Sequence, residues 1–309
     1  MAQDNTPVGR IFEEIGISHI KGEQTILYDA LGEPFPVNEI DGFYYPQIIR
    51  PDLHEVMKTV NIRDGDIIIC SYPRSGQHWI WNIIYRLTHG MEEAPSGYEE
   101  FCMPELVGQE LDKVPSPRVL RTHQLPDTLP KDIWRKSCKV INIVRHPKDV
   151  ACSFFIHHKT WEPYGYDGTW EGYLPMFLKG EVAWNGLFKH ILAYTKKAEE
   201  TEVMLITFEE CKKDTLGVIK KLAKYIGHER SEDDYKQLIE DTRIESIQSR
   251  NREYDAYSRG GQGNDVMYRQ GKIGDWKNKF TVSQNEMFNK VYKEKMKGTS
   301  YVYDNILDS

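Results

Sequence analysis

The sequence predicts an α/β fold in which a central parallel sheet is flanked by helices. Two observations carry this prediction. Short runs of β-branched and other apolar residues recur along the chain, and segments with apolar residues at helical spacing follow them. Strands that alternate with helices form parallel sheets covered on both faces. We expect the 309 residues to form one domain, because α/β folds of this length often form a single unit.

The four predicted strands comprise residues 66–71, 118–122, 139–144 and 203–208. The apolar residues of 79–87 fall at helical spacing directly behind the first strand. Pro147 follows the third strand, and proline is a favourable first residue of a helix. A helix over 216–226 follows the fourth strand and is closed by Gly227.

Two segments fall outside this pattern. Residues 1–50 are rich in proline, glycine and acidic residues, and we expect a loosely structured arm with short structured pieces. Residues 253–275 include a glycine-rich stretch, and we expect a mobile lid that continues into a ligand loop.

Composition narrows the function classes. The chain has 40 Lys and Arg against 47 Asp and Glu, a net charge of −7, which argues against a nucleic-acid partner but allows a local basic pocket. No run of 18 apolar residues is present, and the first residues lack the basic start and apolar stretch of a signal peptide. We therefore expect a soluble cytoplasmic protein with no membrane partner.

The loop after the first strand has the features of an anion site. Ligands of parallel sheets bind beyond the carboxyl ends of the strands. Residues 72–79, Tyr-Pro-Arg-Ser-Gly-Gln-His-Trp, join the strand to a helix, and backbone N–H groups converge at such a P-loop-like turn. Arg74 adds a positive charge, although the Walker A pattern is absent. The alternative is an ordinary turn with a surface arginine.

The next two strand ends carry further candidates. His123 follows the second strand, where a general base is useful, although a lone histidine is more often structural. Arg145 follows the third strand, and Ser153 lies about two helical turns beyond it, so both side chains can face one phosphate. The alternative is that Arg145 pairs with Asp149 on the surface.

Together these segments resemble the cytosolic sulfotransferase family. The resemblance is carried by residues 72–79, 121–123, 144–153 and 269–278, and it extends from about residue 52 to about residue 301. It implies transfer of a sulfuryl group from 3′-phosphoadenosine 5′-phosphosulfate (PAPS) to the hydroxyl or amine of an acceptor. The by-product is adenosine 3′,5′-bisphosphate (PAP), and the family needs no metal.

The resemblance also implies roles for individual residues. His123 is the base, and Arg74 and Arg121 are the other catalytic residues. The 5′-phosphosulfate is held by the loop residues Arg74, Ser75, Gly76, Gln77 and His78, and Trp79 stacks on the adenine. The 3′-phosphate is held by Arg145, Ser153, Arg269, Gln270 and Gly271. Phe208 and Thr242 also contact the nucleotide.

Several residues depart from the family pattern. Arg74 and Arg121 stand where the family usually has lysine, and Gln77 and His78 stand for threonines. Phe208 replaces a tyrosine and Gln270 a lysine. These changes keep open the alternative of a weakly active or non-catalytic member that binds a nucleotide or a lipophile. A nucleotide kinase is disfavoured because the Walker A lysine is absent.

The partners implied are a small acceptor and a second copy of the chain. Aromatic residues in 36–45, 94–107, 154–170 and 253–268 suit a phenol, a steroid or another lipophilic alcohol, and His157 suits a more polar one. The family's dimer motif matches Lys277, Thr281, Val282 and Glu286, which predicts a homodimer. A helix start capped by Thr281 or Ser283 is compatible with this prediction.

Overall fold

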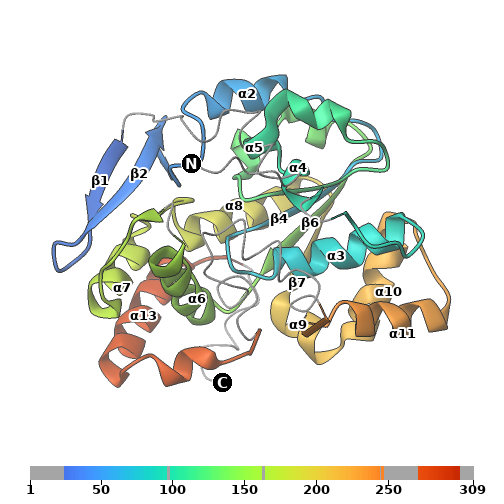
Figure 1. Cartoon of the computed structure of the whole chain (residues 1–309). Coiled ribbons are helices and arrows are strands. Elements are labelled where there is room, and N and C mark those ends of the chain that lie inside the picture. The colour runs from blue at the N-terminus through green and yellow to red at the C-terminus, as the bar shows by residue number, and fades with distance from the viewer. Residues whose placement is uncertain (1–23, 96–97, 162–163, 244, 247–270, 300–309) are drawn as a thin grey trace, which may run out of the picture.

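Four short segments pair in parallel to form the central sheet, as the sequence predicts (Figure 1). The computed structural model describes residues 24–95, 98–161, 164–243, 245–246 and 271–299. The strands are β4 (Ile67–Ser71), β5 (Val119–Thr122), β6 (Lys139–Val144) and β7 (Val203–Thr207). Every residue of β4 is buried, which explains why this strand is a continuous apolar run. The predicted fold class is confirmed.

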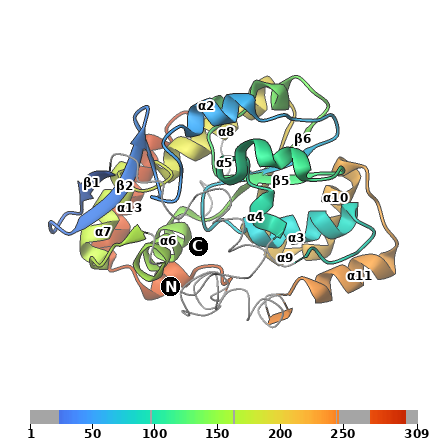
Figure 2. The same cartoon turned by 45° about the horizontal axis from the view of Figure 1, so that its top comes forward.

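The strand order is β5-β4-β6-β7. This order creates a crevice at the carboxyl ends of the two central strands, β4 and β6. The chain leaves β4 toward β5 and leaves β6 toward β7, in opposite directions. Right-handed crossovers therefore put α3 (Gln77–Thr88) on one face and α6 (Pro147–Thr160) on the other. Figures 1 and 2 both show these helices on opposite sides of the strands. The loops after β4 and β6 meet between them, where ligands of such sheets bind.

Most predicted helix signals are confirmed. α6 begins at Pro147, and α10 (Thr215–Ile226) ends at Gly227 with a φ of +75°. Thr281 caps α13 (Val282–Lys295) through a capping box with Gln284. The fourth strand ends one residue earlier than predicted, because Thr207 caps α9 (Phe208–Lys213).

The remaining α-helices are α2 (Leu53–Thr59), α4 (Tyr98–Phe101), α5 (Pro104–Val107), α7 (Trp170–Lys179), α8 (Leu187–Glu200) and α11 (Glu232–Asp241). The 3₁₀ helices are η2 (Gly108–Lys113), η3 (Pro126–Thr128), η4 (Lys131–Trp134) and η6 (Asp275–Asn278). Within the described ranges, no helix has both the length and the apolar character needed to cross a membrane.

Residues 24–45 are more regular than the loosely structured arm that the sequence predicts. The strands β1 (Gln24–Tyr28), β2 (Pro34–Ile40) and β3 (Phe43–Tyr45) form a separate antiparallel sheet. Phe35 and Val37 of β2 are fully buried in the same core as the central sheet. β3 pairs with residues 38–40 only, so the part of β2 that holds both prolines is an edge, where proline is tolerated.

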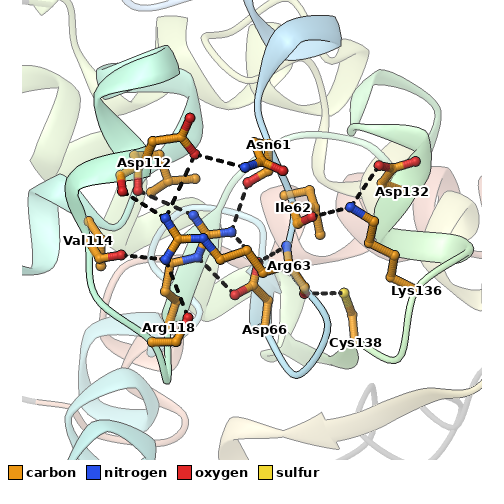
Figure 3. Close-up of polar contacts among 12 residues, drawn as sticks. Asn61, Ile62, Arg63, Asp66, Asp112, Val114, Arg118, Asp132, Lys136 and Cys138 are labelled. Atoms are coloured by element: carbon orange, nitrogen blue, oxygen red, sulfur yellow. Dashed lines mark hydrogen bonds and ion pairs between the residues drawn. The ribbon is translucent and has the colours of Figure 1, made fainter.

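A buried polar network closes the end of the sheet opposite the crevice (Figure 3). Arg118, at the start of β5, and Asp66, at the start of β4, are both fully buried. The Arg118 guanidinium donates to both carboxylate oxygens of Asp66 and to the carbonyls of Leu111 and Asn61. Asp66 also accepts from the backbone N–H of Arg63 at 2.8 Å. This network fixes the starts of two neighbouring strands.

The buried His158 makes the stability of the fold depend on pH. Its ring lies 3.8 Å from that of Phe154, and neither ring nitrogen has a hydrogen-bond partner among the described residues. Burial, and then the charge of Arg74, lowers the pKa of His158 well below its ordinary value. Below pH 6.5 His158 binds a proton in the unfolded chain but stays neutral in the folded chain. The free energy of unfolding therefore falls on acidification.

We expect His158→Phe to remove this acid sensitivity. Between pH 6.5 and pH 5 the histidine costs about 2 kcal/mol of unfolding free energy, at 1.36 kcal/mol per pH unit. Urea unfolding at pH 8 and pH 5 should therefore show a loss on acidification that is about 2 kcal/mol smaller in the variant than in the wild type. An identical loss in both proteins would show that His158 is protonated in the folded state.

Candidate active site

The loop between β4 and α3 is shaped to receive an anion. Arg74 and Gly76 both have left-handed backbone conformations, with φ of +70° and +98°. Gly76 caps α3 without a side-chain bond, so the first N–H groups of the helix stay open. The Ser75 hydroxyl is fully buried and has no hydrogen-bond partner in the described part of the chain. Such a hydroxyl suits a phosphate or sulfate oxygen.

Gly76 is also required by close packing. A Cβ at this position would lie 2.7 Å from Cδ2 of Phe208, the first residue after β7. The loop after β4 therefore contacts the residue that follows β7, although about 130 positions separate them. Phe208 stands where the resemblance places a nucleotide contact.

Arg145 connects the loop predicted to hold the 5′-phosphosulfate to the 271–276 segment. Its guanidinium donates to the Arg74 carbonyl and to the Lys272 carbonyl, each at 3.0 Å, and lies 4.6 Å from the centre of the Phe208 ring. Nε of Arg74 donates to Oγ of Ser153 at 3.1 Å. The predicted pair Arg145 and Ser153 is thus brought together around Arg74.

Asp149 has a different role from the surface pairing considered as an alternative. Its carboxylate accepts from the backbone N–H groups of Gly274 at 2.7 Å and Trp276 at 2.9 Å. It therefore fixes the loop that begins at Gly271, which has a φ of +56°. Arg269 and Gln270 lie outside the described residues, as does most of the predicted lid over 253–275.

Trp79 and Thr242 complete the predicted nucleotide side. The Trp79 ring is partly exposed and lies edge-on to Phe208, with centroids 6.0 Å apart. Lys212 places its Nζ 5.0 Å from the centre of the Trp79 ring. Thr242 is buried, and its hydroxyl donates to the Leu238 carbonyl at 2.7 Å, so its proton is already used within α11.

The side chain of Gln77 differs from the prediction. It is buried between two strands and donates to the carbonyls of Ile69 at 3.0 Å and Thr122 at 2.9 Å. Both amide hydrogens are therefore used inside the sheet, so the side chain of Gln77 has none left for a phosphate. The residue still contributes its backbone N–H at the start of α3.

His123 has the tautomer that a base requires. Its Nδ1 lies 2.8 Å from the carbonyl oxygen of Ser71, which can only accept, so Nδ1 carries the proton and Nε2 keeps its lone pair. The pKa of His123 is lowered to about 3, first by burial and then by the charges of Arg121, His78 and Arg74, while the Ser71 bond acts in the opposite sense. The ring is therefore neutral at ordinary pH.

The positive charge of Arg121 is offset by two acidic residues. The arginine is buried, and its guanidinium lies 3.2 Å from Glu99 and 3.7 Å from Glu100. Nδ1 of His78 lies 2.8 Å from the same Glu99 carboxylate. The family resemblance implies that Arg121 is a catalytic residue beside Arg74. In the structure its charge is offset by α4.

Glu105 is a residue of the site that the sequence analysis missed. It is fully buried, and one carboxylate oxygen accepts from the His123 backbone N–H at 2.9 Å and from the Thr122 hydroxyl at 3.1 Å. Burial raises the pKa of Glu105 to about 7, against these hydrogen bonds. The signal that could have revealed it is a single acid inside the apolar run 102–107, since such a residue needs buried partners.

Trp184 was also missed, and it forms a wall beside the base. Its ring lies 5.2 Å from His123 and 5.6 Å from Tyr45, edge-on in both cases. Its backbone φ is +64°, which is unusual for a tryptophan. No local pattern in the sequence predicts this conformation.

The described residues contain no group of three or more His, Cys, Asp or Glu side chains arranged to hold a metal ion. The site therefore offers an anion loop, an arginine that donates to Ser153, a second arginine that donates to the backbone of the first, and a neutral histidine at the adjacent strand end. This arrangement can bind a phosphorylated ligand and remove a proton from a second molecule beside it.

Comparisons with known proteins point to one family. The family model described as "Sulfotransferase domain" matches residues 64–300. Human sulfotransferase 1C2 is 28% identical over 301 residues, which cover 89% of this chain and 97% of that protein. Mouse sulfotransferase 1B1 is 31% identical over 278 residues, which cover 83% of this chain and 91% of that protein.

Solved structures agree with these relatives. The mouse sulfotransferase SULT7A1 complexed with PAP superimposes with a TM-score of 0.74 at 26% identity, over 88% of this chain and 96% of that one. A retinol dehydratase complex with androsterone and the inactive cofactor PAP has a TM-score of 0.71 at 19% identity, over 98% and 97% of the two chains. The second likeness concerns the fold alone.

Proposed function

The chain belongs to the sulfotransferase family, and on this premise we propose that it transfers a sulfuryl group from PAPS to a small lipophilic acceptor, with His123 as the base. The family assignment supports sulfuryl transfer from PAPS to small acceptors. The observation that carries the rest of the proposal is the meeting of the 72–76 loop, Arg145 and Ser153 beside the neutral His123.

The residues present fit the nucleotide. We assign the 5′-phosphosulfate to the open N–H groups of α3 and the unpartnered Ser75 hydroxyl. We assign the 3′-phosphate to Arg145 and Ser153, with Arg269, Gln270 and Gly271 beside them, because Arg145 already contacts the 271–276 loop through Lys272. The partly exposed Trp79 is assigned to the adenine, with Phe208 and Thr242 around it. The PAP complex of the mouse relative supports a nucleotide of this kind as the ligand.

The chemical step follows from the tautomer of His123. The acceptor oxygen attacks the sulfur while the bond from sulfur to the bridging oxygen breaks, and that electron pair stays on the leaving phosphate. The acceptor proton moves to Nε2 of His123. Arg74 stabilises the charge that develops on the leaving group, as a fixed cation in a site of low polarity. Arg121 contributes by holding Gln77 and the end of β5, through its bond to Gln77 at 3.3 Å.

The acceptor and the assembly are part of the same proposal. The Trp184 ring beside His123, with the Tyr45 ring packed against it, favours an acceptor with an aromatic or other apolar body, such as a phenol, a steroid or an alcohol. The homodimer through Lys277, Thr281, Val282 and Glu286 is supported by the exposure of Val282, which is 77% accessible at the start of α13. The cytoplasmic location and the single-domain organisation rest on the family resemblance.

Sulfuryl transfer can be tested directly. With labelled PAPS and a panel of phenols, steroids and alcohols, we expect turnover of at least one acceptor together with the release of PAP. Gly76→Ala is expected to weaken PAP binding by at least tenfold in calorimetry, because the new Cβ would strike Phe208 in a left-handed backbone.

Gly90→Ala is the matched control for this variant. Its backbone is also left-handed, with a φ of +66°, but its Cβ would meet nothing within 4 Å. It should lose some stability and keep its PAP affinity. Equal PAP affinities in the two variants would remove the loop from the nucleotide site, and the absence of turnover with every acceptor would favour the non-catalytic alternative.

A further inference from the structure

A second basic hollow lies outside the site described above. It has a volume of about 170 Å³ and is lined by Lys179, Lys189, Lys295 and Asn185, with the backbone of Gly180 and Gly186. These residues come from the end of α7, the start of α8 and the end of α13, and the β2–β3 turn closes the hollow. α7 and α13 lie side by side in both views (Figures 1 and 2). We call this hollow the lysine pocket.

The charges of the lysine pocket are not balanced by acids. Lys179 lies 3.6 Å from Glu181. Lys189 and Lys295 have no carboxylate partner among the described residues. Their Nζ atoms lie against aromatic rings instead, Lys189 4.1 Å from the centre of Phe43 and Lys295 5.6 Å from that of Phe188. Three cations and one nearby carboxylate leave two positive charges over the hollow, which favours an anion.

Asn185 lines the lysine pocket with a largely buried side chain. Its side chain is 8% exposed, and its Oδ1 accepts from the Tyr44 backbone N–H at 2.8 Å. Its Nδ2 has no hydrogen-bond partner in the described part of the chain, and the residue lines the hollow. A side-chain amide has two N–H donors, so this Nδ2 can donate to a ligand in the hollow.

The backbone around Asn185 is strained. Trp184 and Asn185 are two consecutive non-glycine residues in the left-handed conformation, each with a φ of +64°. Such conformations are unfavourable for residues other than glycine and persist where the surrounding structure holds them. Here the strain places the Asn185 amide at the hollow, between the Tyr44 backbone and the start of α8.

The start of α8 provides further N–H donors. Gly186 caps the helix without a side-chain bond, and its first turn contains no acidic residue. Lys189 lies in that first turn, where a cation is unfavourable because it faces the positive end of the helix dipole. An anion bound between Lys189 and the first N–H groups of the helix is attracted by both. It therefore offsets the repulsion between the lysine and the helix dipole.

We propose that the lysine pocket binds a small tetrahedral oxyanion, either a free phosphate or sulfate ion or the same group carried on a small molecule. Lys189 and Lys295 supply the charge, and Asn185 donates its second hydrogen bond to the ligand. Trp184, which contacts His123, precedes Asn185 directly, so an anion in the pocket is adjacent to the wall beside the base.

Binding is tested by proton–nitrogen NMR of the Asn185 side-chain amide, assigned by its absence in Asn185→Asp. Titration with inorganic phosphate at low ionic strength should shift this signal to saturation. Lys189→Ala with Lys295→Ala should raise the half-saturating concentration at least tenfold. The control pair, Lys196→Ala with Lys293→Ala, removes the same charge from exposed positions on the same two helices and should stay within twofold of the wild type.

Two further variants separate this site from its surroundings. Asn185→Asp keeps the shape and the Tyr44 contact but replaces the donor with a negative oxygen, and in calorimetry it should abolish phosphate binding at the pocket. Gly76→Ala disables the nucleotide loop and should leave the Asn185 titration unchanged. Phenyl phosphate distinguishes the source, because tighter binding than inorganic phosphate indicates a group carried on a molecule and weaker binding a free ion.

The proposal is overturned if the Asn185 signal does not move with phosphate, or if both lysine pairs weaken the titration equally. The measurement involves no turnover, so its failure leaves the sulfuryl-transfer proposal untouched.

Discussion

Replacing His123 with asparagine is expected to lower kcat for sulfuryl transfer by about 10²–10⁴-fold, the usual contribution of a general base. The asparagine amide can still donate to the Ser71 carbonyl, as Nδ1 of His123 does at 2.8 Å. The lone pair of Nε2 is lost, so the acceptor proton has no base. The measurement is steady-state turnover with labelled PAPS and the best acceptor of the panel.

A binding measurement separates chemistry from misfolding. PAP affinity in the His123→Asn variant should stay within about threefold of the wild type, since no nucleotide contact is removed. His228→Ala changes a histidine beyond the end of α10 and should leave both quantities unaltered. Turnover that survives in His123→Asn would falsify the base assignment, whereas joint loss of turnover and PAP affinity would indicate a structural role.

Replacing Arg118 with methionine is expected to lower the free energy of unfolding by about 3–5 kcal/mol, because it leaves Asp66 charged and buried without its partner. Four hydrogen bonds of the guanidinium are lost at once, two of them to that carboxylate. Urea unfolding at pH 7 measures the effect. The change lies at the opposite end of the sheet from the crevice, so the folded fraction should keep its PAP affinity.

Arg63→Met is the matched control for this prediction. Arg63 belongs to the same network (Figure 3), but its side chain is 31% exposed and donates mainly to the carbonyls of Val114 and Asp112. We expect the free energy of unfolding to fall by about 1 kcal/mol, because the buried carboxylate of Asp66 keeps its partner Arg118. The double variant Arg118→Met with Asp66→Asn should recover part of the loss of Arg118→Met alone. Equal losses in both single variants would contradict the buried-pair argument.

The central sheet was predictable because its information is local. Buried parallel strands are short apolar runs, and Pro147 and Gly227 mark helix ends by their own backbone preferences. The N-terminal sheet was not predictable in this way. Pro34 and Pro36 make β2 look unlike a strand in the sequence. Proline is tolerated there because β3 does not extend along this part of β2, and that pairing depends on the tertiary structure.

The candidate site also contains residues that local sequence predicts and residues that only distant contacts place. The meeting of Arg145 and Ser153 at Arg74 followed from the place of Arg145 directly after β6 and of Ser153 in the helix behind it. The inward turn of Gln77 and the pairing of Arg121 with Glu99 depend on contacts between segments that are distant in the sequence. Glu105 and Trp184 reach His123 in the same way, so neither the wall beside the base nor its buried carboxyl support has a local signature.

The antiparallel sheet at the start of the chain has a consequence for the order in which the protein can fold during synthesis. Tyr44 is held by the Asn185 side chain, 141 positions downstream. A ribosome adding about 5–20 residues per second needs roughly 7–28 seconds to supply that partner. Until then Tyr45 also lacks Trp184, against which its ring packs, so this part of the sheet leaves apolar surface in water. Nascent chains arrested before residue 185 should therefore engage chaperones through residues 34–45, and chains arrested beyond it should not.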